Sequence, residues 1–234
     1  MYEKSSNNID VYYCLDLLQH KNKQAHYFAT LDQREQTIAG RFKREILTQR
    51  YILAHGLLRE VLAKYVNESA IDLQFMHSEK GKPFLLNYPE LSFNMSHTGD
   101  AWVLAVVQAK CHLGIDIEYF KVRESWQGLV KKCFSAEESE YWHGLPVADQ
   151  GRFFYQLWVR KEAFVKAVGE GITLGLDRCV VNPVAINQFL RLPECAGSLD
   201  SWQSYDFDIA PELLAAVVCN QKHVSLNLTE LAVS

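Results

Sequence analysis

The strand that decides the fold is predicted over the segment Gly114-Ile115-Asp116-Ile117-Glu118. This segment and the preceding run Val103 to Val107 are short, apolar and rich in β-branched residues, which is typical of buried strands. Side chains on a strand alternate between its two faces, so Asp116 and Glu118 share one face, roughly 6.6 Å apart, and Ile117 points to the other. The segment therefore predicts two carboxylates side by side at the end of a strand.

Two carboxylates on one face of a strand can share a hard cation. Magnesium takes oxygen ligands in octahedral geometry and keeps waters and substrate phosphates beside one or two protein carboxylates. The pair Asp116 and Glu118 fits this coordination pattern better than that of a calcium loop, which needs more oxygen ligands. Taken alone, however, Asp-x-Glu is short and common, and a solvent-facing acidic strand end is the more frequent explanation.

A second segment, from Arg152 to Val168, predicts an amphipathic helix. Its apolar residues fall on one side at 3.6 residues per turn: Phe154, Leu157, Trp158, Phe164, Val165 and Val168. Glu162 and Lys166 lie one turn apart at the edge of this stripe, where they can reach one ligand or form an ordinary ion pair. Lys161 falls within the stripe, and a buried lysine needs an anionic partner. That partner is either a phosphate or a structural carboxylate.

Further motifs, added to these two segments, define a resemblance to a known family: Gly81-Lys82-Pro83, Phe93-Asn94-Met95-Ser96-His97 and, more weakly, Cys133-Phe134-Ser135-Ala136-Glu137-Glu138. In their order and intervals they resemble the 4'-phosphopantetheinyl transferases of the surfactin-synthetase-activating type, also described as holo-carrier-protein synthases. The strong motifs run from Gly81 to Gly169, over a third of the chain.

The resemblance implies a reaction. Phosphopantetheine would pass from coenzyme A to a serine of an acyl or peptidyl carrier protein, leaving adenosine 3',5'-bisphosphate. Asp116, Glu118 and Glu162 would hold magnesium, with manganese as an open alternative, and Asp116, Glu162 and Lys166 would form the catalytic group. Glu162 could also accept the serine proton. Lys166, together with Lys161, would bind phosphate oxygens.

The same resemblance implies the contacts to coenzyme A. Ser96 and His97 would meet its phosphates, Lys82 and Pro83 its nucleotide end, and Arg50 its 3'-phosphate. Without the resemblance, His97 would be explained by a hydrogen-bonded core histidine, and the Gly-x-Pro segment by a polar turn before a strand.

One stretch departs from the family pattern. Relatives often carry more basic residues just before the helix of Arg50, where this chain has Thr37-Ile38-Ala39-Gly40. Arg41 or Lys43 are candidates to replace them. The departure affects the 3'-phosphate contacts more than the chemistry.

The implied fold class is α+β. Two similar pseudo-symmetric halves, residues 1–110 and 111–234, would each pack a long helix on a small, mainly antiparallel sheet, with coenzyme A in the cleft between them. The helices are expected near Arg50 to Tyr65 and Phe153 to Val168. Strands of the second half are expected near Cys179 to Val181, Tyr205 to Ile209 and Ala215 to Val218. Residues 182–204 indicate a loop, and residues 221–234 give no signal.

Composition narrows the class of protein. The net charge of -4 argues against nucleic-acid binding. No segment resembles an export signal, and no apolar run approaches the length of a membrane span. The six cysteines show no Cys-x-x-Cys spacing, which favours reduced thiols in a cytoplasmic protein. Because each half would cover the other, a monomer is expected.

Two other functions use the same residues. A metal-dependent phosphodiesterase or nuclease would need the carboxylates and Lys166, but not Gly81-Lys82-Pro83 or Ser96-His97. A non-catalytic module that binds coenzyme A or a carrier protein would have no need of a proton acceptor beside a metal. The sequence leaves the carrier open among those of nonribosomal peptide, polyketide, polyunsaturated and primary fatty acid biosynthesis. Lys131, Lys132 and Phe134 are a candidate carrier-docking patch, with a solvated helix end as the alternative.

Overall fold

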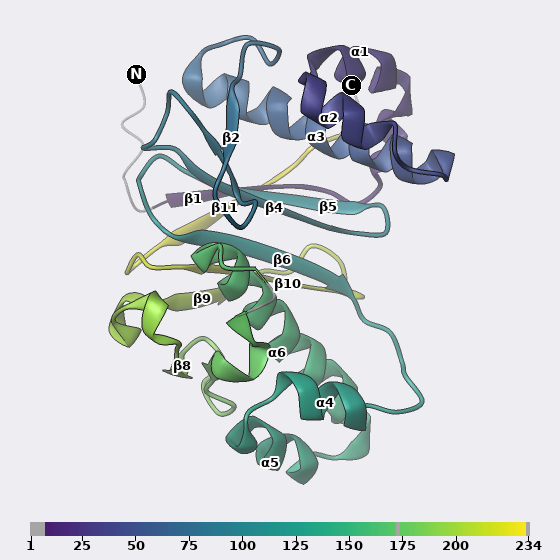
Figure 1. Cartoon of the computed structure of the whole chain (residues 1–234). Coiled ribbons are helices and arrows are strands. Elements are labelled where there is room, and N and C mark those ends of the chain that lie inside the picture. Colours follow the sequence, from purple (N-terminus) through teal and green to yellow (C-terminus); the bar gives the residue numbers. More distant parts are fainter. Residues whose placement is uncertain (1–7, 172–173, 233–234) are drawn as a thin grey trace.

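Two β-sheets pack face to face at the centre of the computed structural model, which describes residues 8–171 and 174–232 (Figure 1). The first sheet has the order β11-β1-β5-β4 and the second the order β6-β10-β9. The strands of the first are β1 (Asn8–Cys14), β4 (Ser92–Thr98), β5 (Ala101–Val107) and β11 (Ser225–Glu230), and those of the second are β6 (Leu113–Tyr119), β9 (Gln203–Asp206) and β10 (Leu213–Cys219). Within these two sheets neighbouring strands are antiparallel, except that β1 and β11 are parallel.

One long helix covers the outer face of each sheet (Figure 1). Helix α3 (Glu45–Val66) lies on the first sheet and helix α6 (Val147–Val168) on the second. Shorter elements surround them: α1 (Gln24–Thr30), α2 (Gln33–Ala39), α4 (Gln127–Cys133), α5 (Ala136–Gly144) and the 3-10 turns η1 (Leu17–Lys23), η3 (Leu176–Arg178), η4 (Glu194–Ala196) and η5 (Leu199–Ser201). Two small hairpins complete the described structure: β2 (Phe75–His77) with β3 (Pro83–Leu85), and β7 (Val180–Val181) with β8 (Phe189–Arg191).

Strand periodicity divides the apolar side chains among three core layers. In β5, Leu104 packs in the cluster beneath α3, whereas Val103 packs between the two sheets. In β6, Ile115 and Ile117 also face the space between the sheets. The alternate residues of β6, Gly114, Asp116 and Glu118, therefore lie on the face of the strand toward helix α6.

Gly114 sets the close approach of α6 to β6. A Cβ at this position would lie 1.9 Å from the carbonyl oxygen of Ala163 and 2.5 Å from the amide nitrogen of Ala167. Only glycine leaves room for the helix backbone there. The contact brings the second half of α6 directly against the strand that carries Asp116 and Glu118.

The predicted α+β class of two similar halves is confirmed. Both helices begin earlier than expected, at Glu45 and Val147. The expected division after residue 110 falls between β5 and β6, but β11 returns to the first sheet. Neither β1 nor β11 was predicted, and the expected loop 182–204 contains β8. Among the described residues, the helices are all too short or too polar to cross a membrane.

Candidate functional site

Polar side chains of β4 join the neighbouring edge of β6. Asn94 accepts a hydrogen bond from the amide of Ile115 (2.9 Å), and the hydroxyl of Ser96 donates to Oδ1 of Asp116 (2.8 Å). Thr98 donates to Oε2 of Glu118 (3.0 Å). Because these residues alternate along β4, all three face β6. The edge strands of the two sheets are thereby tied together, and both carboxylates are held in place.

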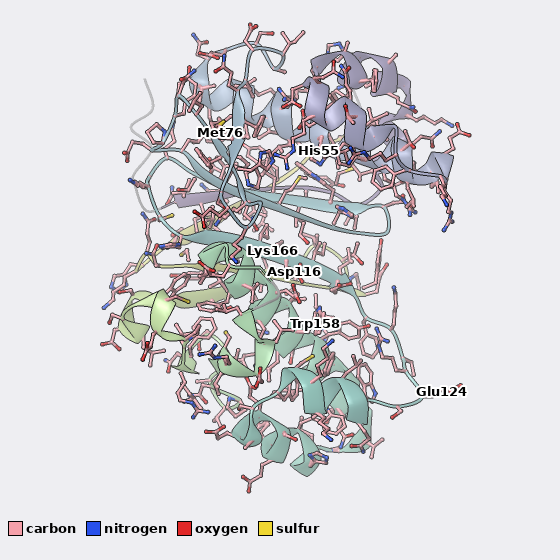
Figure 2. The ribbon with its side chains drawn as sticks, in the orientation of Figure 1. His55, Met76, Asp116, Glu124, Trp158 and Lys166 are labelled. Atoms are coloured by element: carbon pink, nitrogen blue, oxygen red, sulfur yellow. The ribbon has the colours of Figure 1, made fainter. Side chains whose placement is uncertain are left out.

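Helix α6 adds a cation to this arrangement. Nζ of Lys166 lies 2.7 Å from Oδ1 of Asp116 and 2.7 Å from Oγ of Ser96. Figure 2 shows Lys166 and Asp116 side by side between α6 and β6. The Asp116 side chain is 7% exposed, and its other oxygen, Oδ2, is buried without a hydrogen-bond partner among the residues that the structure describes. A buried carboxylate oxygen without a partner is costly unless a ligand satisfies it.

The pKa values of three carboxylates in this region are raised, chiefly by burial. Burial raises the pKa of Asp116, against the opposing effect of Lys166. Burial, and then the charge of Asp116, raise the pKa values of both Glu118 and Glu162. A divalent cation would relieve this repulsion, and carboxylate oxygens are the ligands that magnesium prefers. The donor set and the free Oδ2 of Asp116 therefore fit such a cation. Even so, no three Asp, Glu, His or Cys side chains in the described parts of the chain already converge as metal ligands.

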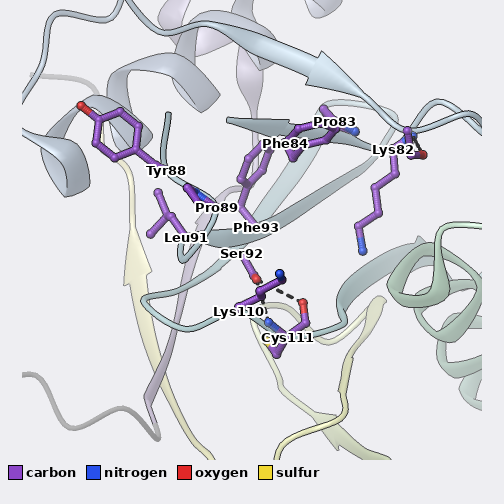
Figure 3. A pocket seen from close by; sticks show the side chains of 11 residues that line it. Lys82, Pro83, Phe84, Tyr88, Pro89, Leu91, Ser92, Phe93, Lys110 and Cys111 are labelled. Atoms are coloured by element: carbon purple, nitrogen blue, oxygen red, sulfur yellow. Dashed lines mark hydrogen bonds between the residues drawn. The ribbon is translucent and has the colours of Figure 1, made fainter. Parts of the chain in front are cut away.

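A hollow of about 310 Å³ opens beside these residues, and both halves of the chain line it. Glu162 and Lys166 come from α6, whereas Lys82 and Pro83 come from the β2–β3 hairpin. Lys82 and Pro83 also border a neighbouring hollow of about 290 Å³, where apolar side chains such as Phe93 form the wall (Figure 3). The structure thus places Glu162, Lys166, Lys82 and Pro83 around one cavity.

The ammonium of Lys82 contacts backbone atoms of the second half. It donates to the carbonyl oxygens of Leu113 (2.9 Å) and Ala167 (2.8 Å). Burial lowers the pKa of Lys82 to about 8. Its predicted contact with the nucleotide end of coenzyme A stays a prediction.

The two remaining predicted contacts are His97 and Arg50. His97 is exposed and lies on the opposite face of β4 from Ser96. Desolvation by the surrounding protein, and then the charge of Lys166, nevertheless lower the pKa of His97, and the charge of Arg50 acts in the same direction. Arg50 of α3 makes a bidentate ion pair with Asp100, at 2.7 and 3.0 Å. Ser96 itself is buried and donates a hydrogen bond to Asp116, which helps to hold that carboxylate. Its predicted contact with the phosphates of coenzyme A stays a prediction.

The surroundings of Lys161 contradict its suggested contact with a phosphate. Its side chain is fully buried, and its ammonium donates to Glu138 (2.8 Å) and to the carbonyl oxygens of Leu176 (2.9 Å) and Cys179 (2.5 Å). An ammonium has three donors, so none is left for a phosphate. The suggested phosphate contact is wrong, and the structural ion pair is the correct alternative.

One residue of the candidate carrier-docking patch, Phe134, is not on the surface. Phe134 is 5% exposed and packs in the core beneath α6, because helix α4 ends just before it. Only Lys131 and Lys132 remain on the surface. The solvated helix end explains this segment.

Sequence reasoning missed the roles of Asn94 and Thr98. The signal was present as a polar side chain at every second position of the strand: Ser92, Asn94, Ser96 and Thr98. Such a pattern predicts a polar face, but it does not reveal that this face meets the edge of β6.

Comparison with known proteins agrees with this architecture. Residues 112–219 match the family model of the 4'-phosphopantetheinyl transferase superfamily, and residues 19–109 match the model of the 4'-phosphopantetheinyl transferase N-terminal domain. The chain is 30% identical over 210 residues to the 4'-phosphopantetheinyl transferase psf-1 of Bacillus pumilus. This match covers 89% of this chain and 86% of that protein. It is 31% identical over 167 residues to the 4'-phosphopantetheinyl transferase Sfp of Bacillus subtilis, covering 71% and 72%.

A third relative, the 4'-phosphopantetheinyl transferase HetI of a Nostoc species, is 33% identical over 147 residues, or 62% of each chain. Together, the fold and these matches define an enzyme of the phosphopantetheinyl transferase class. The chain belongs to the 4'-phosphopantetheinyl transferase superfamily.

Proposed function

We propose that this enzyme transfers 4'-phosphopantetheine from coenzyme A to a serine of an acyl or peptidyl carrier protein and releases adenosine 3',5'-bisphosphate. The observation that supports this most directly is the pairing of Lys166 with Asp116, beside a hollow that both halves line. The serine oxygen forms a new bond to phosphorus, and the bridging P–O bond of the pyrophosphate breaks. The departing bisphosphate takes the electron pair of that bond.

Asp116, Glu118 and Glu162 would hold the Mg²⁺ ion of this reaction, or Mn²⁺ in its place. The bound cation supplies positive charge that neutralises the departing phosphate. Two observations support this assignment: Oδ2 of Asp116 is buried with no partner among the described residues, and the pKa values of the three carboxylates are raised.

The chain's own groups have separate tasks. Lys166 binds a phosphate oxygen and stabilises the leaving group, as fixed cations do in phosphoryl transfer. Glu162 accepts the proton of the incoming serine, and the raised pKa that follows from its burial makes it a stronger base. His97, Arg50 and Pro83 contact the phosphates and the nucleotide end of coenzyme A, a contact that the family resemblance also suggests for Lys82. We further propose that the enzyme acts as a cytoplasmic monomer.

The first test is the intact mass of apo carrier proteins incubated with the enzyme, coenzyme A and magnesium, with a parallel sample in EDTA. We expect a gain of one phosphopantetheine that needs the metal. Carriers from peptide, polyketide and fatty acid synthases should be compared, with Lys166→Met as the inactive control. No gain on any of them, while coenzyme A still binds, would contradict the proposal and favour a binding module.

A further inference from the structure

Lys82 connects the two halves of the enzyme through a single ammonium group. It lies in the β2–β3 hairpin of the first half, whereas both of its acceptors, Leu113 and Ala167, belong to the second half. The two bonds measure 2.9 and 2.8 Å, and the lysine side chain is half-buried, with its ammonium turned toward these two carbonyls. This is an unusual use of a lysine, whose flexible side chain is commonly exposed.

The two acceptors belong to the elements that carry the site. Leu113 is the first residue of β6, three residues before Asp116. Ala167 lies in the last turn of α6, directly after Lys166, and its carbonyl has no partner within the helix. A cation at the C-terminal end of a helix is electrostatically favourable. Lys82 therefore bridges β6 and α6 next to the Asp116–Lys166 pair.

The hairpin delivers this side chain in a fixed direction. The amide of Gly81 donates to the carbonyl of Ser78 (2.9 Å), and the amide of Lys82 donates to the Ser78 hydroxyl (3.1 Å). Gly81 has a φ of 90°, which disfavours other residues, and Pro83 restricts the backbone on the other side. The Lys82 stem also passes Gly169, where an added Cβ would lie 3.2 Å from its Cδ.

We infer that Lys82 is a positioning residue, which holds β6 and α6 in the arrangement that places Lys166 against Asp116. This inference rests on the proposed function and gives one of its expected coenzyme A contacts a different task. A phosphate contact acts on the affinity for coenzyme A. A positioning residue acts on the geometry of the reacting groups, so its loss lowers kcat more than it raises KM.

Steady-state kinetics of Lys82→Met separate these two tasks. Methionine keeps an apolar stem beside Gly169 but cannot donate to Leu113 or Ala167. We expect kcat to fall about tenfold or more, with the KM for coenzyme A within about twofold of wild type. Lys82→Arg, whose guanidinium can donate to two carbonyls, should recover part of kcat. Lys110→Met is the matched control, because it removes the same charge from the neighbouring hollow (Figure 3) and should keep the wild-type kcat. A raised KM with an unchanged kcat would overturn the inference.

Two measurements do not depend on turnover. Hydrogen–deuterium exchange of the ligand-free proteins should be faster in residues 113–118 and 163–169 of Lys82→Met, but not of Lys110→Met. In the wild-type enzyme, NMR of the ¹⁵N-labelled lysine ammonium groups should show slow proton exchange at Lys82, with and without adenosine 3',5'-bisphosphate. Unchanged hydrogen–deuterium exchange in Lys82→Met would refute the inference. So would a change in the Lys82 ammonium signal on adding adenosine 3',5'-bisphosphate that shows the ammonium leaving the two carbonyls for the phosphate. A wild-type enzyme that fails to modify any carrier would instead refute the proposed function.

Discussion

The ammonium of Lys166 lies 2.7 Å from Oδ1 of Asp116, the carboxylate whose other oxygen is buried with no partner in the described part of the chain. Lys166 comes from α6 and Asp116 from β6, and Ser96 of β4 hydrogen-bonds to both. Asp116 thus contacts the lysine through Oδ1, and its Oδ2 is available to a ligand. A cation and a phosphate bound here would both be adjacent to the same ion pair.

Replacing Lys166 should separate metal binding from transfer. In Lys166→Met, Asp116 loses its counter-charge, so a divalent cation should bind more tightly because it no longer competes with the ammonium. Transfer should nevertheless fall by about 10²- to 10³-fold, because the leaving group loses a fixed cation. Calorimetric titration with Mg²⁺ and Mn²⁺ measures the first effect, and carrier modification measures the second. In the matched variant Asp116→Asn, both metal binding and transfer should be lost. Weaker metal binding in Lys166→Met would contradict the assignment of Asp116 as a ligand.

Thr98 should affect the metal site through Glu118. Thr98→Val keeps the shape of the side chain but removes the 3.0 Å hydrogen bond that orients the Glu118 carboxylate. Groups that orient metal ligands affect metal affinity by about 10- to 100-fold, so the affinity for Mg²⁺ should fall by at least about tenfold. The free energy of unfolding should change by only about 1 kcal/mol. Thr98→Ser should bind the metal like the wild type, and an unaffected affinity in Thr98→Val would show that Glu118 needs no such support.

Lys161 should matter for stability rather than for coenzyme A. Lys161 and Glu138 are both fully buried, and Glu138 also accepts hydrogen bonds from the amides of Ser135 and Val181. Lys161→Met leaves a buried carboxylate without its cation, which should lower the free energy of unfolding by about 3–5 kcal/mol. Denaturant titration measures this loss, and Glu138→Gln added to Lys161→Met should restore part of it.

The control for that experiment is Lys132→Met, at an exposed position of α4, which should unfold like the wild type. Calorimetry on the folded fraction of Lys161→Met should give the wild-type affinity for coenzyme A. A weakened affinity there would mean that Lys161 reaches the cofactor after all.

Periodicity explains which parts of the site could be predicted. The period of two in a strand places Asp116 and Glu118 on one face, and the period of 3.6 in a helix places Glu162 one turn from Lys166. Both patterns are local and visible in a few residues. The identity of the anion beside Lys161 is not local, because Glu138 lies on a separate helix. The pattern therefore predicted a partner for Lys161 without identifying it.

The missed parts of the fold depend on contacts between distant segments. Strand β11 pairs with β1 from the opposite end of the chain, and its side chains are mostly exposed, so it shows no strong alternation. The role of Thr98 likewise depends on β4 and β6 being the adjacent edges of two different sheets. Short-range periodicity contains no information about which strand edges meet.

The packing of α6 on β6 predicts a severe effect at Gly114. In Gly114→Ala, the new methyl group would lie 1.9 Å from a backbone oxygen of Ala163, which no side-chain rotation relieves. The helix must shift, so we expect a loss of at least about 2–3 kcal/mol of unfolding free energy and a strong loss of transfer. Gly128→Ala is the matched control, because nothing lies within 4 Å of its added Cβ in α4. That variant should be about 0.5–1 kcal/mol more stable. Thermal unfolding of both compares them directly, and equal stability would disprove the close approach.

Acid should destabilise the first half through Glu35 of helix α2. Its burial raises the pKa, but a hydrogen bond from His55 and the charge of Arg59 outweigh this, so the folded-state pKa lies below its ordinary value of 4.5. As the pH falls, the unfolded chain therefore binds the proton first. The stabilisation is complete above about pH 5, and it is lost as the pH falls through the folded-state pKa.

In Glu35→Gln, fully buried Arg59 loses its closest carboxylate, so unfolding at pH 7 should become easier by about 3–5 kcal/mol. Because the titrating group is absent, stability between about pH 5 and pH 3 should fall less steeply than in the wild type. Urea titrations at several pH values measure both effects, with Glu90→Gln at an exposed position as the control. A wild-type slope in Glu35→Gln would assign the acid sensitivity to other carboxylates.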